Sequence, residues 1–319
     1  MKKSIIIMGI LVLTVVTGMI ITHQTRESVR PTQSKKVAAT IFPLYDITKN
    51  IAGGEFEVVL MLPSGASPHT FDPQPSLLKE LSGVQTVFAI GQGLDDWSHN
   101  LAESVGADVV RVDTGISLRA TVDDHEEHEH DDQHEEDGHG HDEEHEGHNH
   151  GPIDPHYWLS VHNAQQITTN IADVLSELDP ENATRYQANA NAYLEQLEIL
   201  EEELEGQTAS ISNPNIISLH DAWYYFADEF GLNIVGTFEP SAGKNPTPQY
   251  LETLEEEVEE HDVSILFLEP QLSTDSIKAF ATDHNLGFAT IDPLGGVEGR
   301  SSYIELMRYN VQAVVDTLK

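Results

Sequence analysis

The sequence of 319 residues contains no cysteine. This absence excludes disulfides, thiolate metal sites and a lipid-modified cysteine anchor, so a transition-metal site would have to use imidazole and carboxylate groups. Basic residues are also scarce: 16 lysines and arginines stand against 54 acidic residues, which gives a formal net charge of −38. A nucleic-acid partner is excluded, because binding phosphates needs clustered lysine and arginine. An acidic chain instead concentrates cations around it.

Histidine is abundant, and its distribution is uneven. Nine of the 17 histidines lie in residues 123–150, together with fourteen acidic residues and no lysine or arginine. This segment therefore carries −14 of the net charge and leaves −24 on the rest of the chain. It offers nothing to form a core, and we expect residues 121–151 to be a disordered loop. We interpret its histidines as weak accessory metal sites, with a solvated spacer as the alternative: His125, His128, His130, His134, His139, His141, His145, His148 and His150.

The N-terminus has two lysines followed by a run without charge from residue 5 to residue 21. This pattern is typical of a secretory signal. The run is also close to the lower limit for a membrane span, so an uncleaved anchor is the alternative. We therefore expect an extracytoplasmic protein, in the periplasm or on the outer face of the cell membrane. Residues 1–35 would form the signal or anchor and a tether, and the protein would not be a Cys-linked lipoprotein.

Short β-rich runs alternate with helical stretches from residue 36 onward. Strands that alternate with helices predict mostly parallel sheets with crossover helices. The alternation occurs twice and predicts an α/β fold of two lobes, 36–160 and 207–319, each with a central sheet flanked by helices. Between them, residues 161–206 have helical periodicity, and a helix over 181–205 would span roughly 37 Å. We interpret it as a long strut that joins the lobes, with an ordinary crossover helix as the alternative.

Four residues outside the histidine-rich segment are candidate ligands, and three of them lie at or just past the end of a strand. His69 lies in a turn-rich loop after a strand, and His156 lies in a loop ahead of a helix. His220 and Asp292 each follow an apolar strand directly. Open α/β sheets bind ligands beyond the carboxyl ends of their strands, so these residues, two from each lobe, can meet in the cleft between the lobes.

Four motifs that contain these residues resemble those of the metal-binding proteins of ABC transporters that import zinc or manganese. They read SGASPHTFDP at 64–73, DPHYWL at 154–159, LHDAWYYF at 219–226 and DPLGG at 292–296, in the order of the family. The resemblance runs from about residue 37 to the C-terminus. It implies two α/β lobes bridged by a rigid helix, with the metal held between them. It assigns the ligand role to His69, His156, His220 and Asp292, and it implies a membrane permease with its cytoplasmic ATPase as partner.

The ligand set bears on the choice of metal. Three imidazoles and one carboxylate suit tetrahedral Zn²⁺, whereas manganese favours more oxygen ligands. Manganese-binding relatives typically have glutamate at the third position, where this chain has His220. The resemblance therefore favours Zn²⁺ as the transported ligand. Some zinc-binding relatives place a glutamate before the first histidine, where this chain has Pro68, so we expect Asp292 as the fourth ligand, with water as the alternative.

These inferences predict a monomeric protein that captures Zn²⁺ outside the cytoplasm and delivers it to an ABC permease for high-affinity uptake. The alternatives are a manganese- or iron-binding protein of the same transporter family, and a metal-dependent adhesin or metal store. A zinc hydrolase fits less well, because catalytic zinc needs an open coordination position and a general base. Four protein ligands would leave no place for substrate, and the sequence has no His-Glu-x-x-His motif. We therefore expect that the chain is not an enzyme.

Overall fold

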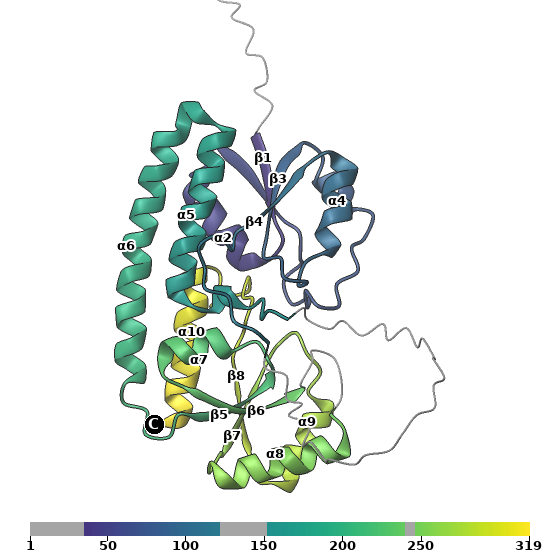
Figure 1. The fold of residues 1–319 in the computed structure, drawn as a ribbon, viewed down its shortest axis with the longest axis vertical. Coiled ribbons are helices and arrows are strands. Elements are labelled where there is room, and N and C mark those ends of the chain that lie inside the picture. Colours follow the sequence, from purple (N-terminus) through teal and green to yellow (C-terminus); the bar gives the residue numbers. More distant parts are fainter. Residues whose placement is uncertain (1–34, 122–151, 240–245) are drawn as a thin grey trace, which may run out of the picture. The chain divides into compact units, whose positions relative to one another are not determined.

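The computed structural model describes residues 35–121, 152–239 and 246–319 of the chain. Within these residues the strands form two four-stranded sheets, in the orders β2-β1-β3-β4 and β6-β5-β7-β8. All strand pairs are parallel, and helices connect the strands (Figure 1). Both sheets have the same order: the second strand lies on one side of the first, and the third and fourth strands lie on the other side. The predicted α/β fold of two lobes with parallel sheets is confirmed.

The first lobe is built around β1, the second strand of its sheet. Residues 37–39 of β1 are fully buried, as expected for a parallel strand with helices on both faces of the sheet. The loop that follows β2 passes through residues 63–73 and carries the first of the four motifs. The elements of this lobe are β1 (Lys35–Ala39), α2 (Phe42–Ala52), β2 (Phe56–Leu60), α3 (Leu77–Glu80), β3 (Val84–Ala89), α4 (Trp97–Val105) and β4 (Asp108–Arg111).

The second lobe repeats this arrangement around β5. The strand is buried from Ile216 onward and ends at His220, so an imidazole stands at the carboxyl edge of a buried strand. The elements of this lobe are β5 (Asn215–His220), α7 (Tyr224–Phe230), β6 (Asn233–Glu239), α8 (Pro248–Glu260), β7 (Ile265–Leu268), α9 (Asp275–Asp283), β8 (Gly287–Thr290) and α10 (Tyr303–Leu318).

Two long helices connect the lobes. The chain passes through η1 (Tyr157–Leu159), α5 (Val161–Leu178), η2 (Pro180–Asn182) and α6 (Ala183–Thr208). Ser160 caps α5, because its hydroxyl accepts a hydrogen bond from the backbone N–H of Asn163 at 3.1 Å. The 26 residues of α6 span roughly 39 Å. This helix packs against α5, α2 of the first lobe, and α7 and α10 of the second (Figure 1), as expected for a strut.

One apolar cluster extends through both lobes. The largest buried cluster runs from β1 and α2 through η1, α5 and α6 to β5, α7 and α10. Hydrogen bonds cross it as well: Trp158 Nε1 donates to the Pro293 carbonyl at 2.7 Å, and the Tyr303 hydroxyl donates to the Trp158 carbonyl at 2.8 Å. The C-terminal helix α10 also contacts α2 of the first lobe. The described lobes are therefore packed against each other and not only linked through a helix.

One glycine lies at a close contact between the lobes. Gly296 has φ of +78°, and a Cβ there would lie 2.9 Å from Phe42 Cδ2 and 2.9 Å from Ser64 Oγ. The Ser64 hydroxyl donates a hydrogen bond to the Gly296 carbonyl at 2.8 Å. A side chain at this position would separate the loops that carry the first and fourth motifs.

No helix in the described ranges is both long and apolar enough to cross a membrane. The apolar run of residues 5–21, interpreted above as a signal or anchor, lies outside those ranges.

Candidate metal-binding site

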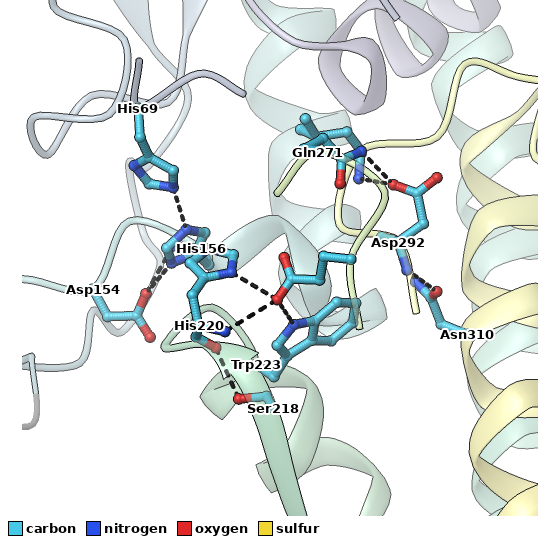
Figure 2. Close-up of polar contacts among 11 residues, drawn as sticks. His69, Asp154, His156, Ser218, His220, Trp223, Gln271, Asp292 and Asn310 are labelled. Atoms are coloured by element: carbon cyan, nitrogen blue, oxygen red, sulfur yellow. Dashed lines mark hydrogen bonds and ion pairs between the residues drawn. The ribbon is translucent and has the colours of Figure 1, made fainter. Parts of the chain in front are cut away.

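The structure brings together three of the four predicted ligands. His69 comes from the loop after β2, His156 lies just before η1, and His220 is the last residue of β5. One nitrogen of each ring lies within 4.8 Å of a nitrogen of both other rings (Figure 2). The distance between His69 Nε2 and His156 Nε2 is 3.3 Å. This is the one group of three or more potential ligands with such spacing among histidine, aspartate and glutamate in the described chain.

His156 is fixed by the first residue of its own motif. It is 2% exposed, and its Nδ1 lies 2.8 Å from Asp154 Oδ1. The same oxygen accepts the backbone N–H of His156 at 2.9 Å. A carboxylate on Nδ1 favours the tautomer with its proton on that nitrogen, so that Nε2 carries the lone pair that can bind a metal. The ring of Trp158 packs beside the imidazole at 5.2 Å between centroids.

His220 has the corresponding support from a different strand. Its Nδ1 lies 2.7 Å from Oε1 of Glu269, the residue that follows β7. The same oxygen accepts a hydrogen bond from Trp223 Nε1 at 3.1 Å (Figure 2). Glu269 was not among the residues predicted from the sequence, although one signal is present: this acid directly follows an apolar strand, as Asp292 does. Its pairing with His220 spans 49 residues of sequence, so spacing alone does not reveal it.

The electrostatics of His220 favour a positive charge beside the ring. Burial lowers the pKa of His220, but the charge of Glu269 and its hydrogen bond outweigh burial and raise the pKa to about 8. His220 Nε2 is buried and has no hydrogen-bond partner within the described chain. A metal ion at Nε2 would replace the proton as the source of positive charge and would satisfy this atom. The residues therefore fit a bound cation.

The structure does not bring Asp292 into the three-histidine group. Its Oδ1 accepts hydrogen bonds from Gln271 Nε2 at 2.8 Å, Leu294 N at 3.0 Å and Gly295 N at 3.1 Å. Its Oδ2 lies 3.2 Å from the guanidinium of Arg300. Both oxygens are thus held by other groups of the second lobe. Asp292 as a metal ligand stays a prediction.

The three imidazoles line a small pocket between the lobes. Apolar side chains complete its walls, and Glu269 and Gln271 contribute further polar groups. Apolar walls limit access of water and strengthen the interaction of a cation with its ligands. The apolar lining consists of Pro68, Trp158, Leu272, Pro293 and Leu294.

The nine histidines interpreted as weak accessory sites all lie outside the described residues, and their role stays a prediction: His125, His128, His130, His134, His139, His141, His145, His148 and His150. Three other histidines lie beside single carboxylates. His162, His261 and His284 are 3.8, 3.2 and 3.6 Å from a glutamate oxygen. None of the three belongs to a group of potential ligands within the described chain.

Comparison with known proteins identifies the family. The profile of the family described as "Zinc-uptake complex component A periplasmic" matches residues 37–317. The manganese-binding lipoprotein MntA of Halalkalibacterium halodurans is 29% identical over 89% of this chain and 88% of its own. The zinc uptake protein ZnuA of Yersinia pestis is 29% identical over 90% and 92%. The zinc-binding protein AdcA of Streptococcus pyogenes is 27% identical over 88% of this chain, which spans only 55% of AdcA.

Solved structures agree with this result. A crystal structure of ZnuA superposes with a TM-score of 0.74 at 25% identity, over 90% of this chain and 100% of that chain. A ZnuA deletion mutant with zinc bound superposes with a TM-score of 0.75, also at 25% identity, over 90% and 99%. The resemblance seen in the four motifs is therefore confirmed, and it extends to the whole described fold.

The relatives correct the prediction on localisation. Two of them are named as lipoproteins: MntA, and the manganese ABC transporter substrate-binding lipoprotein PsaA of Streptococcus mitis, which is 28% identical. The expectation that this protein stands apart from the Cys-linked lipoproteins is therefore wrong. It relied on the absence of cysteine from the composition. Lipid anchoring therefore occurs among relatives of this family, which composition alone does not reveal.

The matching proteins bind and transport metal ions, and they are not enzymes, as predicted. Their names include both zinc and manganese, so the relatives identify a class of cargo and not one metal. A family of this kind supplies the substrate-binding component of an ABC transporter, which works with a membrane permease and an ATPase. The chain belongs to the zinc-uptake component A family, the metal-binding substrate-binding proteins of ABC transporters for zinc or manganese.

Proposed function

We propose that this protein captures Zn²⁺ with His69, His156 and His220 and delivers it to an ABC permease. The convergence of three imidazoles is the observation that supports zinc. Zinc accepts three nitrogen ligands in a tetrahedral site, and within the described chain no carboxylate oxygen lies within 4.8 Å of the ligand atoms of all three rings. Manganese, the harder ion, favours carboxylate and water oxygens.

The supports of the rings add to this preference. Asp154 and Glu269 each hold Nδ1 of a buried histidine. A ligating histidine that donates its second N–H to a carboxylate is a stronger base and is fixed in orientation. Both properties favour the tight binding of a small, four-coordinate ion.

Manganese is the second candidate. The observation in its favour is the 29% identity with MntA, a protein named for manganese, which equals the identity with ZnuA of Yersinia pestis. Such a site can also bind several divalent ions tightly, because affinity follows the Irving–Williams order.

Metal analysis of the full chain purified without added metal, followed by competition titrations with Zn²⁺ and Mn²⁺, tests the proposal. We expect one tightly held zinc per chain and displacement of manganese by zinc. His220→Ala should abolish this tight binding, since it removes one of three protein ligands. His162→Ala is the matched control, because His162 is 76% exposed and lies outside the group.

Two results would contradict zinc capture. Tighter binding of Mn²⁺ than of Zn²⁺ would make manganese the cargo. Unchanged tight binding in His220→Ala would show that the three-histidine group is not the capture site. Growth of a strain that lacks the protein, under zinc limitation and with either wild type or His220→Ala restored, tests delivery.

A further inference from the structure

Three buried side-chain atoms of the metal pocket have no hydrogen-bond partner in the described chain: His220 Nε2, Gln271 Oε1 and Glu269 Oε2. A buried polar atom without a partner destabilises the folded state. Such atoms are uncommon in native proteins and indicate where an ion or an ordered water binds. Because all three line the same small pocket, one set of ligands can satisfy them together.

The cargo ion accounts for the nitrogen but not for the two oxygens. His220 Nε2 binds the ion in the function proposed above. Neither Glu269 nor Asp292 has an oxygen within 4.8 Å of all three imidazole groups. Glu269 and Asp292 instead contact His220 and Gln271, the two groups that face the ion. The fourth position of a tetrahedral ion is therefore left for a molecule that can reach Gln271 and Glu269.

Gln271 presents an acceptor to the pocket because Asp292 fixes its amide. Gln271 Nε2 donates to Asp292 Oδ1 at 2.8 Å (Figure 2). A carboxylate only accepts hydrogen bonds, so the amide nitrogen faces Asp292 and Oε1 is left for the pocket. The Arg300 guanidinium and two backbone N–H groups hold Asp292 in turn.

The same pattern occurs three times around the pocket. Asp154 supports His156 and Glu269 supports His220, each through a hydrogen bond to the far side of the ring. Asp292 supports Gln271 in the same way, through the far atom of the amide. By this pattern Gln271 faces the ion as the two histidines do, and Asp292 holds it in place as Asp154 and Glu269 hold the histidines.

We propose that a water molecule takes the fourth position of the ion and donates its two hydrogens to Gln271 Oε1 and Glu269 Oε2. This inference rests on the proposed function and deepens it, since it identifies the residues at the fourth position. Three protein ligands and one water complete a tetrahedral zinc site. A cation makes its bound water a stronger hydrogen-bond donor, which suits two buried acceptors. Asp292 is then a positioning residue that acts through Gln271.

Zinc affinity of the full chain, measured by competition with a chelator, tests this arrangement in Gln271→Leu, Asp292→Asn and the double variant. Gln271→Leu removes the acceptor at similar volume, and we expect about tenfold weaker binding. Because Asp292 acts through Gln271, the double variant should bind no more weakly than the weaker single variant. Metal-free Gln271→Leu should unfold at the same temperature as wild type or higher, since the variant lacks a buried acceptor without a partner.

Three outcomes would overturn the inference. Unchanged zinc affinity of Gln271→Leu shows that the amide does not serve the fourth position. Additive losses in the double variant indicate that Asp292 binds the ion directly. A lower unfolding temperature of metal-free Gln271→Leu indicates a purely structural role. Failure of the proposed function is distinct, because in that case the wild-type chain itself does not bind zinc tightly.

Discussion

The two lobes contribute to the metal pocket in different ways. The first lobe supplies His69 and His156 from loops, whereas the second lobe supplies His220 from the end of a strand. Its support, Glu269, follows the neighbouring strand β7. β5 and β7 are the strands between which the chain order of the sheet reverses, the position where open α/β sheets bind ligands. The sheet itself therefore sets the second half of the site, and local loop structure sets the first.

This difference predicts unequal roles for the two supporting carboxylates. Glu269 Oε1 accepts from His220 Nδ1, from the His220 backbone N–H at 3.3 Å and from Trp223. Asp154 Oδ1 accepts the two corresponding bonds from His156. We expect Glu269→Gln to weaken zinc binding about 100-fold and Asp154→Asn about tenfold, roughly 2.7 and 1.4 kcal/mol. Chelator competition measures both.

Glu257→Gln is the matched control for these variants. Glu257 lies 3.2 Å from His261 on the surface of the second lobe, away from the pocket. It should leave zinc affinity unchanged. Equal losses in the two pocket variants, or a larger loss in Asp154→Asn, would contradict the division between a sheet-defined half and a loop-defined half.

The contact between the lobes provides a second test. Gly296 has φ of +78°, and a Cβ there would lie 2.9 Å from Phe42 and from Ser64, both in the first lobe. Gly296→Ala adds this overlap to the backbone strain of a positive φ. We expect it to destabilise the protein by about 2 kcal/mol and to weaken zinc binding, because the loops that carry the ligands move apart. Urea unfolding and chelator competition measure the two effects.

Gly299→Ala isolates the effect of the overlap. Gly299 has nearly the same φ, +79°, but a Cβ there meets no atom within 4 Å. This variant should lose about 1 kcal/mol of stability from backbone strain alone and keep its zinc affinity. If both variants bind zinc as wild type does, the spacing of the lobes at Gly296 does not control the site.

Sequence patterns predicted the local features of this molecule well. Each strand and helix depends on neighbouring residues: the apolar run 216–219 predicts β5, and the periodicity of 181–205 predicts most of α6 (Ala183–Thr208). His220 was recognisable because it follows an apolar strand. Glu269 follows one too, but a carboxylate alone does not indicate that it supports a histidine 49 residues away.

Asp292 illustrates the limit of such reasoning. Its place after β8 led to the prediction of a ligand, and the same place allows Gln271, Leu294, Gly295 and Arg300 to occupy its oxygens. The choice between these roles depends on side-chain contacts among separate loops. Those contacts follow from the packing of the lobe and have no signature in residue spacing.

The smallest effect on stability is expected where α7 of the second lobe contacts the start of α5, a contact we call the seam. Glu229, on α7, accepts a hydrogen bond from the backbone N–H of Val161 at the start of α5, and its second oxygen is buried without a partner in the described chain. Burial is the main cause that raises the pKa of Glu229 to about 7, and the charge of Glu201 adds to it. Unlike Asp154 and Glu269, this carboxylate lies in a seam with no site for a cation among the described residues.

The shift makes stability depend on pH in a defined direction. The folded state holds a proton on Glu229 up to about pH 7, whereas the unfolded chain releases it near pH 4.5. Glu229 therefore stabilises the fold below pH 4.5, and this contribution is lost as pH rises to 7. With allowance for its partial exposure, the loss amounts to about 1–2 kcal/mol.

Urea unfolding of wild type and Glu229→Gln at pH 5 and pH 8 should show that the variant loses less stability across this range. Glu198→Gln, on the exposed side of α6, is the control for the change in charge and should follow wild type. If Glu229→Gln and wild type lose the same stability between pH 5 and pH 8, a group other than Glu229 causes the pH dependence. A smaller loss in the variant with unchanged zinc affinity would show that Glu229 affects the stability of the seam and not metal binding in the pocket.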